Sequence, residues 1–136
     1  MDKDLAIGIL NSLRPVLQDG SYVFCSVQDL SPQLLNDALM LFREAEGITL
    51  VLPKEKADAW GLTYTYVAAW ISLSLYSALD AVGITAAFSA VLAENGISCN
   101  VVAAFHHDHI FVSEADAARA MELLTPPPAA LPAGPY

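Results

Sequence analysis

The sequence predicts an α+β fold in which helices pack on one face of an antiparallel sheet. Over the 136 residues, segments with helical spacing of apolar residues alternate with short β-rich runs. A strand–helix–Gly-Ile–strand pattern occurs twice, and residues 42–49 echo residues 91–98 with an offset of 49 positions from Gly47 to Gly96. Both glycines are expected to end a helix in the left-handed conformation. The duplication favours two half-sized modules that share a core.

Five helices are expected where apolar residues recur at intervals of three and four. They cover residues 5–18, 32–46, 54–60, 84–95 and 113–124. Ser31 is the expected N-cap of the second helix and Pro32 its first residue, because a serine oxygen accepts a hydrogen bond from a free N–H there. The apolar face of this helix is predicted to be Leu35, Leu39 and Phe42.

Five strands are expected between these helices. They cover residues 21–27, 48–52, 66–76, 97–105 and 109–112. Residues 59–79 include no charge and are numerous enough to span a membrane. Within them, apolar residues and serines alternate from Ile71 to Leu75, and no Lys or Arg directly flanks the segment. Because alternation is the pattern of a half-buried strand, we predict a strand and no membrane span.

Charge and composition narrow the classes of partner. Fifteen acidic residues against six basic ones give a formal net charge of −9. Nucleic acids and anionic membrane surfaces are therefore not expected partners, because both are bound through clustered Lys and Arg. Hydrophobic residues make up 55% of the chain. This apolar excess predicts contact surfaces between copies, and a homodimer is expected.

The two cysteines, Cys25 and Cys99, lie in apolar, strand-like runs rather than in a C-x-x-C pair. A zinc site or a disulfide framework needs more ligands than these. Two reduced, buried thiols are expected. The N-terminal segment has no basic stretch typical of a signal peptide, and the cytoplasm is the expected compartment.

The run His106-His107-Asp108-His109 combines three imidazoles with a carboxylate, which are the groups of a metal site. The same residues fit a polar hairpin turn that binds no metal. Motifs of hydrolases, P-loop proteins, zinc proteases and dinucleotide-binding proteins do not occur in the sequence. We therefore predict no catalytic activity, no cofactor and no metal, with a metal-dependent enzyme centred on His106, His107 and His109 as an alternative.

The loop from Asp80 to Ile84 joins a predicted strand to a predicted helix. Asp80 is a natural N-cap, which is a purely structural role. The same loop can bind a ligand, because free N–H groups at a helix start favour a carboxylate and Asp80 can hold an ammonium group. Asn100, on the next strand, offers both a donor and an acceptor. Together these groups predict a small zwitterion such as an amino acid as ligand.

At this loop the sequence resembles the ACT domain signature, in which a strand ends in a D-x-x-G-like loop and a helix ends in A-E-x-G-I. Here the pattern is Asp80-Ala81-Val82-Gly83-Ile84, followed by the segment 93–98. The similarity extends over roughly residues 20–124 and is greatest to small bacterial tandem ACT proteins of uncharacterised function. The regulatory ACT domains of aspartate kinase are also similar.

The resemblance implies ferredoxin-like βαββαβ modules that bind small ligands, usually amino acids, at interfaces between modules. An N-terminal module over residues 1–65, a C-terminal ACT domain over 66–124 and a mobile proline-rich tail over 125–136 are expected. Transferred position by position, the ligand contacts are Asp80, Val82, Gly83, Ile84, Asn100 and Val101. Val82 stands where the family usually has proline, and no sixth strand is evident before the tail.

The leading hypothesis is a non-catalytic, regulatory or sensor protein that binds an amino acid and forms a homodimer. A second hypothesis is a structural interaction module that pairs through sheet edges without a ligand.

Overall fold

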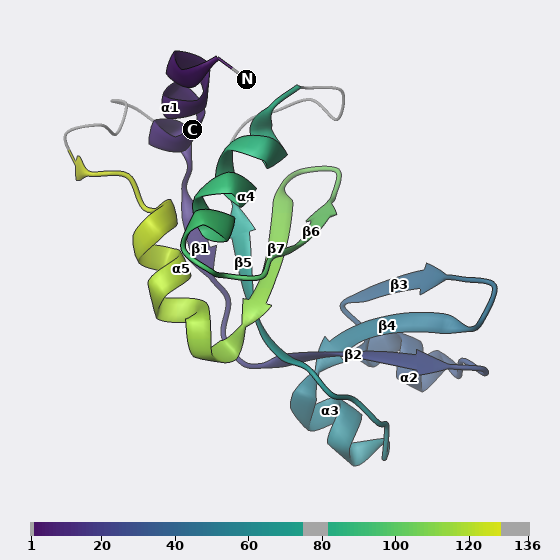
Figure 1. The fold of residues 1–136 in the computed structure, drawn as a ribbon. Helices are drawn as coiled ribbons and strands as arrows, with labels where there is room; N and C mark the ends of the chain where they lie inside the picture. Colours follow the sequence, from purple (N-terminus) through teal and green to yellow (C-terminus); the bar gives the residue numbers. More distant parts are fainter. Residues whose placement is uncertain (1, 75–81, 129–136) are drawn as a thin grey trace. The chain divides into compact units, whose positions relative to one another are not determined.

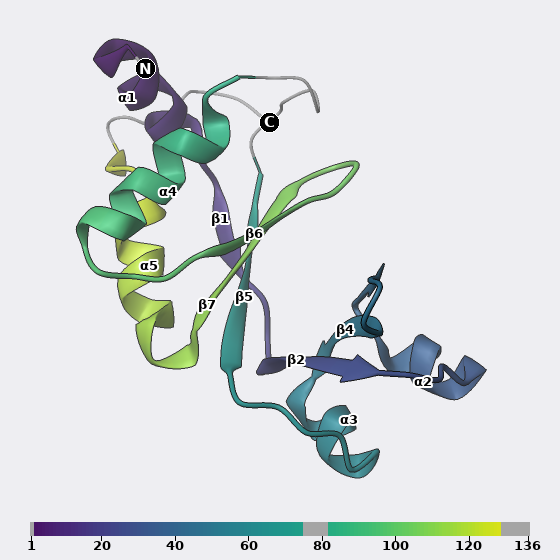
Figure 2. The same cartoon turned by 45° about the vertical axis from the view of Figure 1, so that its right-hand side comes forward.

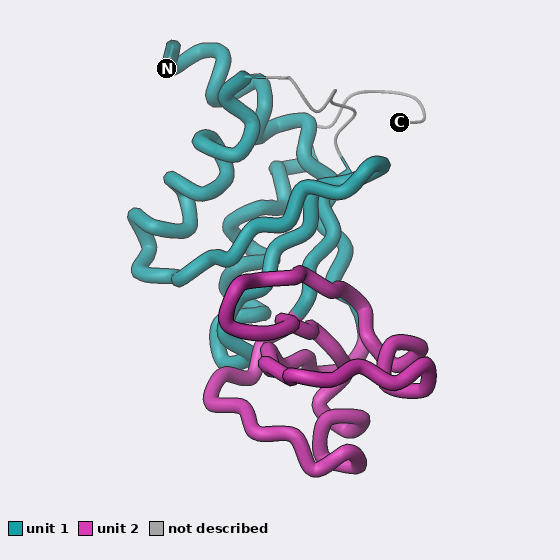
Figure 3. The backbone as a smooth tube through the Cα atoms, turned by 90° about the vertical axis from the view of Figure 1, so that its right-hand side faces the viewer, with its two compact units in different colours: residues 1–18, 70–136 teal, residues 19–69 magenta. Residues whose placement is uncertain are grey.

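The computed structural model describes residues 2–74 and 82–128, and the chain forms two compact units (Figures 1 and 3). The central unit is Asp19–Ala69. The terminal unit combines both ends of the chain, Met1–Gln18 and Trp70–Tyr136. The central unit is therefore inserted, along the sequence, into the terminal unit.

The central unit has the βαββαβ order of a ferredoxin-like module. Its elements are β2 (Tyr22–Val27), α2 (Pro32–Asp37), β3 (Met40–Arg43), β4 (Ile48–Pro53), α3 (Lys54–Ala59) and the first residues of β5 (Val67–Leu73). The strands pair in the order β3-β4-β2-β5, and the pairings of β3 with β4, of β4 with β2 and of β2 with β5 are antiparallel.

Both helices of the central unit cover one face of its sheet. Alternate residues of a strand point to the same face, and Val23 and Cys25 of β2 lie opposite Leu52 and Leu50 of β4. Against this face pack Leu34 of α2 and Ala57 of α3, and all six residues are buried. The layer arrangement of helices on one face of an antiparallel sheet is therefore confirmed in this unit.

The terminal unit has the same order of elements, although its last strand comes from the start of the chain. It comprises α1 (Lys3–Ser12), β1 (Pro15–Leu17), the end of β5, α4 (Ile84–Glu94), β6 (Asn100–Ala103), β7 (Asp108–Ser113), the 3-10 turn η1 (Glu114–Asp116) and α5 (Ala117–Leu124). The strand order is β1-β5-β7-β6. Both views show α4 and α5 on the same side of β5 and β7 (Figures 1 and 2).

Strand β1 takes the place of the strand that the sequence lacks before its proline-rich tail. Val16 lies opposite Ser72 and Leu17 opposite Ile71 in an antiparallel pairing with β5. The Gln18 N–H donates to the Trp70 carbonyl at 2.9 Å and extends the pairing at one end. The second ferredoxin-like module is therefore completed by residues near the N-terminus.

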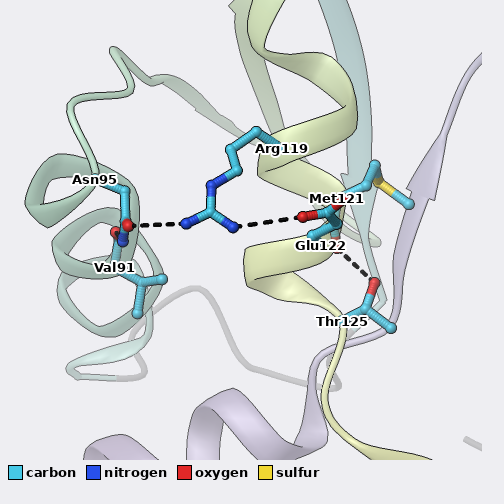
Figure 4. A network of polar contacts seen from close by, with 6 residues as sticks. All are labelled: Val91, Asn95, Arg119, Met121, Glu122 and Thr125. Carbon is cyan, nitrogen blue, oxygen red and sulfur yellow. Dashed lines mark hydrogen bonds and ion pairs between the residues drawn. The ribbon is translucent and has the colours of Figure 1, made fainter.

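The end of α4 is held against α5 by a polar network (Figure 4). The Arg119 guanidinium donates to Asn95 Oδ1 at 3.3 Å and to Glu122 Oε2 at 3.4 Å, and Asn95 Nδ2 donates to the Val91 carbonyl at 2.8 Å. Gly96 has a φ of 73°, so the prediction that it ends the helix in the left-handed conformation is confirmed. These contacts are exposed, and such contacts typically contribute less than about 1 kcal/mol each.

The prediction of a helix over residues 5–18 is wrong beyond Ser12. The backbone of Leu13 is extended, and Pro15 begins β1. Proline lacks the N–H that a helix interior needs and disfavours the helical conformation at Arg14 before it. Leu13 and Leu17 fit the helical spacing of apolar residues, but they lie in extended chain and in β1.

The prediction of a helix over residues 32–46 is also wrong. Ser31 and Pro32 start α2 as expected, and Ser31 Oγ accepts from the Leu34 N–H at 3.1 Å. The helix ends at Asp37, and Met40–Arg43 form β3 because their backbone pairs with β4. Strand pairing here overrides local helix propensity.

The predictions of an apolar face for that helix and of a helix end at Gly47 are also wrong. Leu35, Leu39 and Phe42 are at least 40% exposed. Gly47 lies in the hairpin turn between β3 and β4, where the Glu44 N–H donates to its carbonyl at 3.0 Å. Gly47 precedes the third strand of its unit and Gly96 the second strand of the other, so the repeat at an offset of 49 aligns elements that are not equivalent.

The remaining elements match the predictions more closely. The strands at 48–52 and 109–112 and the helices at 54–60, 84–95 and 113–124 are present within a few residues, whereas the strand expected over 97–105 is limited to Asn100–Ala103. Within residues 2–74 and 82–128, no helix is long and apolar enough to cross a bilayer. The tail beyond residue 128 and the mobility predicted for it lie outside the described residues.

The role of the N-terminal segment can be tested at Leu13, which is completely buried in the terminal unit. Leu13→Ala is expected to lower the free energy of unfolding by about 2–4 kcal/mol, because it leaves a cavity. Urea denaturation measures this loss. Hydrogen exchange should show faster exchange in β5 and β7 than in β4. Leu5→Ala, at a position that is 53% exposed, is the matched control and should change stability by less than about 1 kcal/mol. If Leu13→Ala and Leu5→Ala lowered the free energy of unfolding equally, the burial of Leu13 in the terminal unit would be contradicted.

Candidate functional site

The start of α4 forms part of the predicted ligand site. Gly83 is the N-cap of this eleven-residue helix and has a left-handed backbone with a φ of 96°. Its carbonyl accepts from the Ala87 N–H at 3.0 Å, which closes the first turn. Glycine has no side chain with which to cap the N–H groups of the first turn, so these groups face whatever lies in front of the helix. A carboxylate is the natural partner at such a position.

The neighbouring predicted contacts differ in exposure. Val82 is 89% exposed, whereas Ile84 is half-buried. Asp80 lies outside the described residues. Gly83, three residues after Asp80 in the sequence, occupies the N-cap position of α4.

Asn100 and Val101 begin β6, which is the last strand in the order β1-β5-β7-β6 and therefore an edge strand of its unit. They lie opposite Phe111 and Ile110 of β7, and both are exposed. An edge strand with exposed side chains is open to pairing with another chain.

Within one chain, the start of α4 and the start of β6 are not brought together. Eleven helical residues span about 16 Å, and β6 begins only after α4 has ended and residues 95–99 have followed (Figure 1). Gly83 and Asn100 therefore lie toward opposite ends of the terminal unit. A ligand that touches both groups needs a second copy of the unit.

The side chains of the histidine run are divided between the tip of the β6–β7 hairpin and strand β7. Within residues 2–74 and 82–128, no group of three or more His, Cys, Asp or Glu side chains is placed to hold a metal ion. His106 and His107 are exposed at the tip of the β6–β7 hairpin, beside Phe105, which is 84% exposed. His109 is half-buried on β7, and its ring lies 6.1 Å from that of His107 between centroids. The hypothesis of a metal-dependent enzyme at this run is therefore not supported by the geometry.

His109 belongs instead to a polar network that sequence reasoning missed. Its Nδ1 lies 3.0 Å from Trp70 Nε1 and 3.0 Å from Ser72 Oγ, both on β5. Gln18 Nε2 donates to the same serine oxygen at 3.1 Å. Residues 18, 72 and 109 are far apart in the sequence, and only the pairing of β1 and β5 and the placement of β7 beside β5 bring them together.

A second feature without a sequence signal is a pocket of about 460 Å³ in the central unit. It is lined by Asp19, Gly20, Ser21, Tyr22, Pro53, Lys54, Glu55 and Asp58. Lys54 Nζ lies 3.1 Å from Asp58 Oδ2, and the Tyr64 hydroxyl donates to Asp58 Oδ1 at 2.7 Å. Hydrogen bonds from Tyr64 and Lys54 lower the pKa of the Asp58 carboxyl. The lysine charge is thus already paired within the pocket.

The chain is, by its topology, a tandem of two ferredoxin-like modules with a candidate ligand loop at a strand-to-helix junction. Comparison with protein families agrees with this class. One ACT domain model matches residues 3–69 and another matches residues 66–126. The protein belongs to the ACT domain family, and it carries two ACT domains in tandem. Membership of this family supports a regulatory, ligand-binding role.

Solved structures show the same fold. A protein of unknown function from Vibrio cholerae, described as a possible transport protein, is 45% identical, with a TM-score of 0.80 over 90% of this chain and 94% of that chain. A protein from Agrobacterium tumefaciens is 20% identical, with a TM-score of 0.68 over 83% of this chain and 87% of that chain. Aspartokinase alpha and beta subunits are 15% identical, with a TM-score of 0.54 over 83% and 94%. The similarity to aspartate kinase is thereby confirmed at the level of the fold. A comparison with curated proteins gives no match.

The backbone of Gly83 can be tested by substitution. Gly83→Ala is expected to lower the free energy of unfolding by about 1–2 kcal/mol, because a Cβ disfavours the left-handed conformation. Gly8→Ala is the matched control. Gly8 lies inside α1 and an added Cβ would meet no atom within 4 Å, so alanine there should stabilise the protein by up to about 1 kcal/mol. Urea denaturation of both variants measures the difference, and an unchanged stability of Gly83→Ala would contradict the assigned backbone.

The two cysteines are expected to be unreactive. Cys25 is buried as predicted, whereas Cys99 is only half-buried and precedes β6 rather than lying within a strand. Burial raises the pKa of the Cys99 thiol to about 11 and also raises the pKa of Cys25. At pH 8, a thiol with this pKa is only about one part in a thousand thiolate, which is the reactive form. Labelling by a disulfide reagent at pH 8 should therefore be at least about 100-fold slower than for the protein unfolded in urea. Equal rates would contradict the burial of these thiols.

Proposed function

We propose that this protein is a non-catalytic regulatory ACT protein that binds an amino acid between two copies of its terminal unit. The proposed contacts are Asp80, Val82, Gly83 and Ile84 of one copy and Asn100 and Val101 of the other. The observation that carries the proposal is the start of α4, where the N-cap is a glycine and the first-turn N–H groups receive no side-chain cap from it. These groups suit the α-carboxylate of the ligand.

The remaining proposed contacts suit the ammonium group and the apolar part of an amino acid. The carboxylate of Asp80 would hold the α-ammonium group, and the amide of Asn100 would donate to the carboxylate or accept from the ammonium. Val82, Ile84 and Val101 would contact the ligand's apolar part. The chain has a net charge of −9, and its sequence has no cluster of Lys and Arg. Both features favour a small ligand over a polyanion.

A homodimer is part of the proposal. In one chain, the start of α4 and the start of β6 lie toward opposite ends of the unit, so both can meet one ligand only across two copies. β6 is an edge strand with exposed side chains, which suits such a contact. We also propose that the sequence repeats are residues 1–65 and 66–124, so that the first repeat supplies β1 to the fold of the second. The proposed compartment is the cytoplasm, where free cysteines such as Cys25 and Cys99 stay reduced.

Thermal-shift measurements with each proteinogenic amino acid at millimolar concentration test ligand binding. A ligand that binds only the folded protein at 100 times its Kd adds about 2.7 kcal/mol of stability, which should raise the Tm by several degrees. Asp80→Ala and Asn100→Ala should each remove the shift. Asp29→Ala is the matched control, because Asp29 is exposed in the corresponding loop between β2 and α2 of the central unit, and it should keep the shift.

Light scattering of the same samples separates the alternatives. A dimer whose Tm rises with one amino acid supports the proposal. A dimer that responds to no amino acid would favour the structural interaction module. A monomer that binds an amino acid with full effect after Asn100→Ala would contradict the two-copy site.

A further inference from the structure

Two hydrogen-bond donors of β5 converge on one ring nitrogen of β7. Trp70 Nε1 and Ser72 Oγ each lie 3.0 Å from Nδ1 of His109. The rings of Trp70 and His109 lie 5.6 Å apart between centroids. Ser72 is only 8% exposed, and His109 is half-buried. All of these residues belong to the terminal unit.

The chemistry of the two donors determines the protonation state of the histidine. The indole N–H of Trp70 can only donate, so Nδ1 of His109 must carry a lone pair. The Ser72 oxygen accepts from Gln18 Nε2 at 3.1 Å, which leaves its own hydrogen free to point at the same nitrogen. His109 is therefore neutral, with its proton on Nε2.

We infer that His109 is a pH-sensitive tie between side chains of β5 and β7, which accepts a hydrogen bond from the Trp70 indole when neutral and loses it when protonated. Protonation places an N–H on Nδ1, directly in front of the indole N–H. Two donors then face each other, and the hydrogen bond to Trp70 is lost. The hydroxyl of Ser72 can turn to accept, whereas the indole has no such option.

The surroundings of the ring favour its neutral form. Burial lowers the pKa of His109, the nearby His107 lowers it further, and Asp108 partly opposes both. Trp70 and Ser72 on β5, Gln18 after β1 and Val102, which lies opposite on β6, are uncharged. A histidine with a lowered pKa in the folded state stabilises the fold above its unfolded pKa of about 6.5. This contribution is lost as the pH falls from about 6.5 through the lower folded value.

The position of the tie connects it to the candidate ligand site, and this step rests on the proposed function. Along the sequence β5 precedes the proposed contact Asp80, and Val102, opposite His109, follows the proposed contact Val101. Loss of the hydrogen bond between Trp70 and His109 would therefore act on the two strands that adjoin the proposed contacts. Amino-acid binding should weaken at low pH together with the loss of the tie.

Fluorescence of Trp70 tests the tie without any ligand. The chain has two tryptophans, and Trp60→Phe leaves Trp70 as the single indole. Between pH 8 and 5 its emission should change in one transition with a midpoint below about 6.5, because an imidazolium forms beside the indole. His109→Gln in the same background should abolish the transition, since a glutamine oxygen can accept from the indole but does not titrate. His107→Gln is the matched control and should retain the transition.

A direct measurement on the wild-type protein keeps the test independent of the variants. With ¹⁵N-labelled histidine, NMR should show one ring that is neutral at pH 7 with an unprotonated Nδ1, and the indole N–H of Trp70 should shift with the titration of that ring. The inference would be overturned if the His109 ring carried a proton on Nδ1 at pH 7. It would also be overturned if the Trp70 transition survived the substitution His109→Gln.

The link to the ligand is tested separately, by repeating the amino-acid thermal shift at pH 7.5 and 5.5 with wild type and His109→Gln. A shift that weakens at pH 5.5 only in the wild type supports the link. A pH-dependent tie with no binding at either pH would contradict the proposed function and leave the tie in place. Equal binding at both pH values would contradict the link alone.

Discussion

The antiparallel pairing of β1 with β5 is the constraint on which the terminal unit depends. It supplies the fourth strand of the βαββαβ module and places Gln18 beside Ser72. Without it, residues 71–73 of β5 would lack a neighbour on one side, and their backbone groups there would need other partners. The same strand β5 precedes the candidate ligand loop in the sequence and carries two of the side chains that meet His109. The fold, the site and the histidine tie thus share one strand.

Elements whose conformation is determined by neighbouring residues could be predicted from the sequence, whereas elements determined by long-range contacts could not. The N-cap at Ser31 and the helix end at Gly96 are local, and both were predicted correctly. Met40–Arg43 were assigned to a helix because their residue types suit one, whereas pairing with β4 decides their conformation. The network of Gln18, Ser72 and His109 joins positions that no short motif can connect.

The two units use one topology with different edges. In the central unit β3 is an edge strand, and Phe42 on it is 64% exposed. In the terminal unit the edge strand β6 begins with the polar Asn100 and is followed by a hairpin tip with two exposed histidines. The residues that resemble ligand contacts of the ACT family fall on the second unit, and the corresponding loop of the first contains Ser31 and Pro32 in place of the Asp and Gly pattern. The candidate ligand contacts therefore fall on one unit only.

The insertion of the central unit between β1 and β5 also affects the order in which the chain can fold during synthesis. Asp19–Ala69 is contiguous and has its own core, so it can fold as soon as it has left the ribosome. The terminal unit must wait for α5, although its β1 is made first. The pairing of Tyr22 with Ala68 joins the two ends of the central unit, which lowers the entropy lost when β1 joins β5. A central unit that has folded thus shortens the loop that β1 must close in order to pair with β5.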